Sequence, residues 1–121
     1  MFGHATRESV LTPSERDQAR QDGLCEWVAA ERSDLGWRVE EPPGRGRAVD
    51  IAASMPTRTW LVQVHRGQGG VEEWPSAHRP RALKGAARRQ NATPVVAFVD
   101  VEASAQSVRF WSARTRRAPE P

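Results

Sequence analysis

The sequence has little cysteine, little lysine, no tyrosine and no long hydrophobic run, and two of these shortages exclude classes of protein. Cys25 is the single cysteine of the 121 residues, which excludes an internal disulfide framework and a cysteine-based zinc site. The longest apolar stretches, near residues 60–64 and 94–99, are far shorter than the roughly 20 residues of a membrane-spanning helix. We therefore expect no membrane association, and a start without a basic and apolar leader predicts a cytoplasmic location.

The basic residues are almost all arginine. Eighteen basic residues face 15 acidic ones, giving a net charge of +3, and Lys84 is the only lysine. Arginine holds phosphate groups through two parallel hydrogen bonds, so the bias suits a nucleic-acid partner. A GC-rich genome produces the same bias through codon usage, and both explanations remain open at this stage.

Periodicity predicts seven elements in one domain. A first helix is predicted after an N-cap at Ser14, because the apolar residues Leu24, Trp27, Val28 and Leu35 follow at helical spacing. The helix is expected to end at Gly36, and Gly23 could divide it into two helices. Alternating or apolar runs predict strands at 37–41, 48–53, 58–65, 94–99 and 107–112, and residues 77–91 predict a second helix.

The order of helix, three strands, helix and two strands is typical of an α/β sandwich with a mixed sheet of about five strands. This domain covers residues 14–113. Residues 1–13 are expected to form a flexible N-terminal arm, and residues 114–121 a basic C-terminal tail.

The hairpin formed by strands 48–53 and 58–65 gathers polar residues. A turn at Pro56 and Thr57 places Asp50 opposite Gln63, and alternation puts Gln63 and His65 on one face. A carboxylate, an amide oxygen and an imidazole beside an arginine-rich loop can hold a divalent cation and a phosphate. Alternatively, Asp50 makes a turn hydrogen bond, and the other two are ordinary polar residues on a partly solvated face.

The same residues resemble a known signature. Gly46-Arg-Ala-Val-Asp50-Ile-Ala-Ala, with Gln63-Val-His65 across the hairpin, is similar to the core of the PD-(D/E)XK nuclease superfamily, and most similar to archaeal-type Holliday junction resolvases. The resemblance covers roughly residues 20–113 and implies a restriction-endonuclease-like α/β sandwich with a nuclease-like domain.

The resemblance also implies roles for individual residues. Asp50 would be the central ligand of Mg²⁺ or Mn²⁺, and Gln63 a second ligand through its amide oxygen. His65 stands where the family usually has lysine, and the family's helix carboxylate would be Glu26 or, second, Glu31. Alternatively, Glu26 and Glu31 are solvated carboxylates on the helix surface with no role in the site. Gln63 and His65 depart from the family pattern, because they remove one negative ligand and one fixed positive charge, which indicates reduced, altered or lost catalysis.

Basic and aromatic residues complete the expected surface. The predicted phosphate contacts, which an ordinary solvated basic face would also explain, are Arg45, Arg47, Arg66, Arg81, Lys84 and Arg88. Trp74 lies in a polar loop, where it can stack on an unpaired base or pack against a partner subunit. The other four tryptophans are expected in the core: Trp27, Trp37, Trp60 and Trp111.

Together these features predict a DNA-binding, nuclease-like protein. It would act on branched or structured DNA such as Holliday junctions as a metal-dependent endonuclease and a homodimer, without an organic cofactor. The alternative is a catalytically inactive member of the same fold that serves as a DNA-binding, structural or protein-interaction module.

Overall fold

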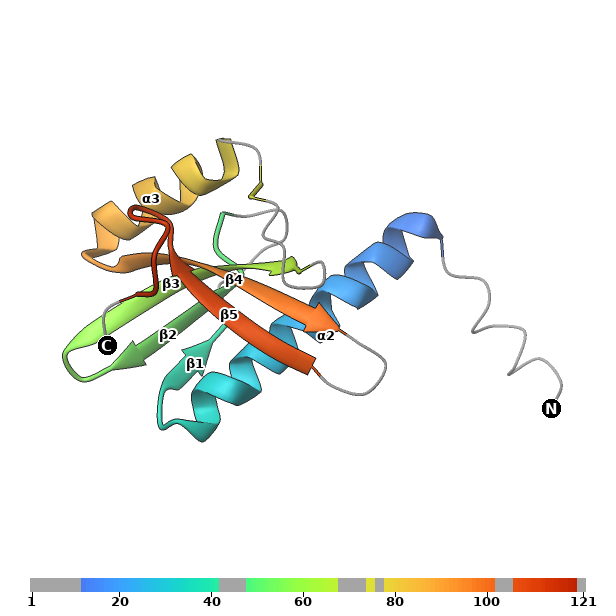
Figure 1. The fold of residues 1–121 in the computed structure, drawn as a ribbon, viewed down its shortest axis with the longest axis horizontal. Helices are drawn as coiled ribbons and strands as arrows, with labels where there is room; N and C mark the ends of the chain where they lie inside the picture. The colour runs from blue at the N-terminus through green and yellow to red at the C-terminus, as the bar shows by residue number, and fades with distance from the viewer. Residues whose placement is uncertain (1–11, 42–47, 68–73, 76–77, 102–105, 120–121) are drawn as a thin grey trace, which may run out of the picture.

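A computed structural model describes residues 12–41, 48–67, 74–75, 78–101 and 106–119. Within these residues the predicted order of elements is confirmed (Figure 1). The elements are α2 (Pro13–Asp34), β1 (Arg38–Glu40), β2 (Ile51–Met55), β3 (Arg58–Arg66), α3 (His78–Gln90), β4 (Thr93–Val101) and β5 (Gln106–Ser112). No helix of the described part is both long and apolar enough to cross a membrane.

The five strands form one mixed sheet in the order β1-β2-β3-β4-β5. β3 and β4 are parallel, and the other neighbours are antiparallel. In the hairpin Ile51 pairs with Val62, which is the register that the turn at Pro56 and Thr57 predicts. The connection from β3 to β4 passes through α3, as a parallel pair requires a crossover. The α/β sandwich with a mixed five-stranded sheet is therefore confirmed.

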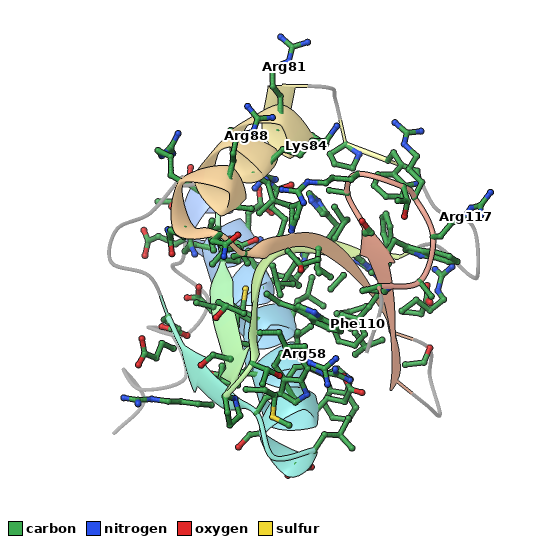
Figure 2. The ribbon with its side chains drawn as sticks, turned by 90° about the vertical axis from the view of Figure 1, so that its left-hand side faces the viewer. Arg58, Arg81, Lys84, Arg88, Phe110 and Arg117 are labelled. Carbon is green, nitrogen blue, oxygen red and sulfur yellow. The ribbon has the colours of Figure 1, made fainter. Side chains whose placement is uncertain are left out.

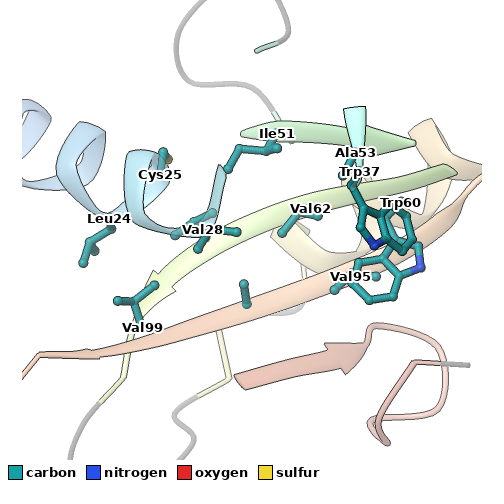
Figure 3. Packing of buried hydrophobic residues seen from close by; sticks show 12 residues of the cluster. Leu24, Cys25, Val28, Trp37, Ile51, Ala53, Trp60, Val62, Val95 and Val99 are labelled. Atoms are coloured by element: carbon teal, nitrogen blue, oxygen red, sulfur yellow. The ribbon is translucent and has the colours of Figure 1, made fainter. Parts of the chain in front are cut away.

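Each face of the sheet is covered by one helix. Alternation along β3 sends Trp60, Val62 and Val64 to the α2 side and Leu61 to the α3 side. Figure 3 shows Leu24, Cys25 and Val28 of α2 among strand residues of the first cluster. Burial of Cys25 raises the pKa of its thiol to about 12, which makes it an inert core residue.

The first helix starts earlier than predicted. Thr12, not Ser14, is the N-cap: its extended backbone lets its hydroxyl oxygen accept a hydrogen bond from the Glu15 N–H at 3.1 Å. Pro13 then occupies the first helical turn, where its missing N–H costs nothing. Gly23 does not divide the helix. Gly36, with a φ of +90°, lies just beyond the helix end, as expected.

Two apolar residues of the predicted first helix are exposed, and one of them, Trp27, was expected in the core. Trp27 is 42% exposed because it lies at the margin of the α2 face that carries the buried residues Leu24 and Val28. Leu35 is 59% exposed because it is the C-cap residue, where the backbone has left the helix. Trp37 and Trp60 are buried as expected, with their ring centroids 4.7 Å apart.

The C-terminal segment folds back on β5. The Ser112 N–H donates to the Arg117 carbonyl at 2.7 Å, and the Arg116 N–H donates to the Ser112 carbonyl at 2.8 Å. We call residues 112–117 the C-terminal hook; it includes much of the segment expected as a basic tail. The hook lies on the α3 side of the sheet, since Ala113 belongs to the same cluster as Leu83 and Ala87 of α3.

Candidate nucleic-acid interface and the signature residues

Asp50 lies immediately before β2, where the hairpin ladder ends. Its carboxylate accepts a hydrogen bond from the Val64 N–H at 2.8 Å, and its own N–H donates to the Val62 carbonyl at 2.8 Å. The carboxylate thus satisfies a backbone donor of β3 that β2 no longer reaches. Burial raises the pKa of Asp50, and the Val64 hydrogen bond and the charge of Arg79 act against that rise.

Gln63 is fully buried and its polar atoms are all used. Its side-chain nitrogen donates to the carbonyl oxygens of Ala48 at 2.8 Å and Arg79 at 2.9 Å. Since both partners can only accept, the amide nitrogen must face them, and the amide oxygen must point the other way. That oxygen lies 3.2 Å from Nε2 of His65. Gln63 therefore ties β3 to the chain before β2 and to the start of α3.

His65 is half-buried beside Gln63. Burial lowers the pKa of His65 to about 4, and the positive charge of Arg79 lowers it further. The ring is therefore neutral at pH 7. Because the Gln63 oxygen can only accept, the proton resides on Nε2, and Nδ1 carries the lone pair.

The structure does not bring the expected helix carboxylates to these residues. Glu26 is exposed on α2. Glu31 bonds to Arg32 at 3.1 Å, and the Arg32 guanidinium lies over Trp60, near the opposite end of β3 from His65. The α2 residue that reaches the site is Gln21, whose amide donates to the Val64 carbonyl at 2.8 Å.

Arg79 is a second residue that sequence reasoning missed. It lies in the first turn of α3, half-buried, and its carbonyl holds Gln63. Its positive charge acts on both Asp50 and His65. The signature residues (Asp50, Gln63 and His65) therefore share their surroundings with a fixed cation from the neighbouring helix.

The donor set does not fit a Mg²⁺ or Mn²⁺ centre. These ions prefer several oxygen ligands, mostly carboxylates. Here Asp50 is the only one of the expected carboxylates beside Gln63, and the Gln63 oxygen is turned to His65 inside the core. Arg79 adds a positive charge, which opposes a second cation. Within the described ranges, no group of three or more histidine, cysteine, aspartate or glutamate side chains is arranged to hold a metal.

The expected phosphate contacts lie mainly on α3. Arg81 and Arg88 are exposed and Lys84 is half-buried, and Figure 2 shows the three side chains on the outer side of the helix. Arg66 is exposed at the end of β3. Arg45 and Arg47 lie outside the described residues.

Charge is distributed unequally between the two sides of the sheet. α2 contains six acidic and three basic residues. α3 contains five basic residues and no acidic one, and the hook adds three arginines: Arg114, Arg116 and Arg117. The three hook arginines are exposed, and Figure 2 shows the Arg117 side chain at the edge of the molecule, pointing outward. The hook lies on the α3 side because Ala113 packs in the cluster of Leu83 and Ala87. We call α3 and the hook together the basic layer.

Comparison with known proteins bears on the fold. The sequence matches no protein-family model, and no curated protein is significantly similar to it. The structure is similar to that of Hjc, a Holliday junction resolvase from the archaeal hyperthermophile Archaeoglobus fulgidus, with a TM-score of 0.66 and 19% sequence identity. The match covers 78% of this chain and 74% of the Hjc chain. The nuclease-like fold expected from the sequence is confirmed.

The low pKa of His65 gives a prediction for stability. The unfolded chain binds a proton near pH 6.5, whereas folded His65 does so only near pH 4, so stability falls as the pH drops through that window. The loss attributable to His65 is at most about 3 kcal/mol of unfolding free energy. The pKa of Asp50 is raised in the folded state, so protonation of Asp50 at low pH favours folding and offsets part of the loss caused by His65.

Urea unfolding at pH 7 and pH 4.5 measures this effect. We expect His65→Gln, which has no titrating group, to lose much less stability than the wild type between the two pH values. Equal losses in both proteins would show that His65 does not couple folding to protonation.

Proposed function

We propose that this chain is a DNA-binding protein of the nuclease fold that holds branched or structured DNA by its phosphate backbone against the basic layer. We further propose that its signature residues maintain the fold and do not cleave DNA. The observation that carries the binding function is the separation of charge between the two sides of the sheet. α2 has six acidic residues against three basic ones, whereas the basic layer has no acidic residue. Such a surface attracts a polyanion without reading its sequence.

Two further points support a DNA partner. The arginines of the basic layer project from a regular helix and from a hook fixed by backbone hydrogen bonds, so little order has to be created on binding. The similar structure, Hjc, is a Holliday junction resolvase. A two-fold dimer, which offers two such layers to one junction, completes the proposal.

The proposed loss of cleavage rests on Gln63. In a metal-dependent site this residue would have to present its oxygen to the ion beside Asp50. Its amide nitrogen is held by two carbonyl oxygens, and its oxygen bonds to a neutral imidazole. Turning the amide to free the oxygen would place that oxygen against two other oxygens, in a fully buried position.

Purified full-length protein tests both parts. We expect it to bind a four-way DNA junction with an affinity that falls steeply as salt is raised, because binding releases counterions from the phosphates. We expect no cleavage of that junction, of duplex DNA or of single-stranded DNA with Mg²⁺ or Mn²⁺. Absence of binding even at low salt would contradict the DNA-binding function, and cleavage would contradict the structural role of the signature residues.

A second candidate function is metal-dependent cleavage, and one observation favours it: Asp50 retains a half-buried carboxylate at the end of the hairpin. Asp50→Asn is the informative variant, since its side-chain oxygen can still accept the Val64 N–H. Junction cleavage by the wild type that Asp50→Asn abolishes would establish this second function in place of the first.

A further inference from the structure

The hook is built around Ser112, which is buried at the end of β5. Its hydroxyl oxygen accepts hydrogen bonds from the N–H groups of Arg114 at 3.2 Å and Thr115 at 3.4 Å. Its backbone bonds to Arg116 and Arg117, as described above. One buried serine thus fixes the backbone from which three exposed arginines project.

Arg116 adopts an unusual backbone conformation within the hook. Its φ is +56°, in the left-handed region that glycine and asparagine adopt more readily than arginine. A residue other than glycine lowers the folding stability at such a position. The strained backbone sets the direction of the Arg116 side chain, which lies across an aromatic ring of another segment.

That ring belongs to Trp74. The guanidinium carbon of Arg116 lies 4.6 Å from the centroid of the Trp74 ring. Trp74 contacts Phe98 of β4 at 5.7 Å with an interplanar angle of 77°, an edge-to-face arrangement. Phe98 is fully buried, so it anchors Trp74 to the sheet, and Trp74 itself is partly buried against the cluster that contains Leu83 and Phe98. Arg109, whose guanidinium lies over Phe98, is held by Asp100 at 2.9 Å.

We propose that Trp74 and Arg116 form a stacking site for an unpaired base of the bound DNA. The inference rests on the proposed function and specifies which feature of branched DNA is recognised. Trp74 offers a ring that is anchored through its contact with Phe98 and capped by the exposed guanidinium of Arg116. A base that moves this guanidinium aside can stack on the Trp74 ring, and the guanidinium can then stack on the other face of the same base.

The charge around the site favours a nucleotide over a protein partner. The hook carries three exposed arginines and no acidic residue, and one of these arginines, Arg116, lies over the Trp74 ring. A nucleotide supplies both a flat ring for Trp74 and a phosphate for the arginines. The basic side chains of α3 would then hold the phosphate backbone of the paired part of a DNA molecule, and the stacking site would hold an unpaired base of the same molecule.

Binding measured by fluorescence anisotropy on two DNA probes tests the proposal. One probe is a blunt duplex, and the other is the same duplex with a two-nucleotide bulge. We expect Trp74→Leu to weaken binding of the bulged duplex by about tenfold, the size of one lost base stack, and to change binding of the blunt duplex less than about twofold. Trp74→Phe, which keeps a ring, should retain most of the affinity.

Two further variants separate stacking from folding. Trp27→Leu removes an exposed tryptophan from α2, on the other side of the sheet, and should leave binding of both probes unchanged. Arg116→Asn removes the guanidinium and introduces asparagine, which tolerates the left-handed backbone at this position. This variant should weaken binding of the bulged duplex selectively.

The outcomes distinguish the two proposals. If the wild type binds both probes and Trp74→Leu and Arg116→Asn weaken them equally or not at all, the stacking site is overturned and the DNA-binding function stands. If the wild type binds neither probe at low salt, the DNA-binding function fails, and the stacking site fails with it.

Discussion

Gln63→Glu is expected to destabilise the protein by at least about 3 kcal/mol at pH 7, because it buries a charge without suitable partners. The new carboxylate would face the carbonyl oxygens of Ala48 and Arg79, which now accept hydrogen bonds from the Gln63 amide. The charge of Arg79 compensates only in part. Urea unfolding of both proteins at pH 7 measures the difference.

Gln90→Glu is the matched control. It makes the same chemical change on the same side of the sheet, but Gln90 is exposed at the end of α3. We expect its effect to stay within about 1 kcal/mol, from the helix dipole alone. If Gln63→Glu proved as stable as Gln90→Glu, the amide of Gln63 would not be locked, and the site would be open to a metal.

This result also bears on attempts to restore the family pattern. Gln63→Glu combined with His65→Lys reproduces the nuclease signature in sequence. We expect the double variant to lose stability for the reason just given and also to place two positive charges, the new lysine and Arg79, close together. On the proposed loss of cleavage, we therefore expect that a gain of cleavage would require a change at Arg79 as well as at the signature residues.

Neutralising α3 is expected to have the largest effect on DNA binding. Replacing Arg81, Lys84 and Arg88 by glutamine should weaken junction binding on the order of 100-fold near physiological salt. The slope of log affinity against log salt should fall by about three, one for each lost phosphate contact. Binding titrations at several salt concentrations measure both quantities.

A charge-matched variant provides the control for this experiment. Replacing Arg16, Arg20 and Arg38 by glutamine removes the same net charge from α2 and from β1, away from the basic layer. We expect a change of less than about fivefold, since long-range attraction alone is lost. Equal weakening by the two triple variants would show that net charge, and not the basic layer, determines binding.

The sequence predicted the fold well because two local periods dominate it. Alternation in the hairpin and the turn at Pro56 and Thr57 were enough to predict the register that pairs Ile51 with Val62. The wrong positions lie where local patterns are ambiguous. Threonine and serine are both common N-cap residues, so the pattern does not distinguish Thr12 from Ser14. Trp27 is exposed in the tertiary structure although it follows Leu24 at helical spacing.

The site was harder to predict because its contacts come from separate elements. Gln21 lies one helical turn before Cys25 on the buried side of α2, so periodicity could have identified it, but a search for carboxylates passes over an amide. Arg79 reaches the hairpin only through the crossover helix. The orientation of the Gln63 amide depends on two carbonyl groups that no sequence pattern indicates.

Hydrogen–deuterium exchange of the full-length chain, with and without a four-way DNA junction, tests the central claim most directly. We predict slower exchange on DNA binding in α3 and in the hook, with α2 unchanged, because DNA would cover the basic layer and leave the acidic side exposed. Protection confined to α2, or no protection at junction concentrations that saturate binding, would contradict the assignment of the basic layer as the DNA-binding surface.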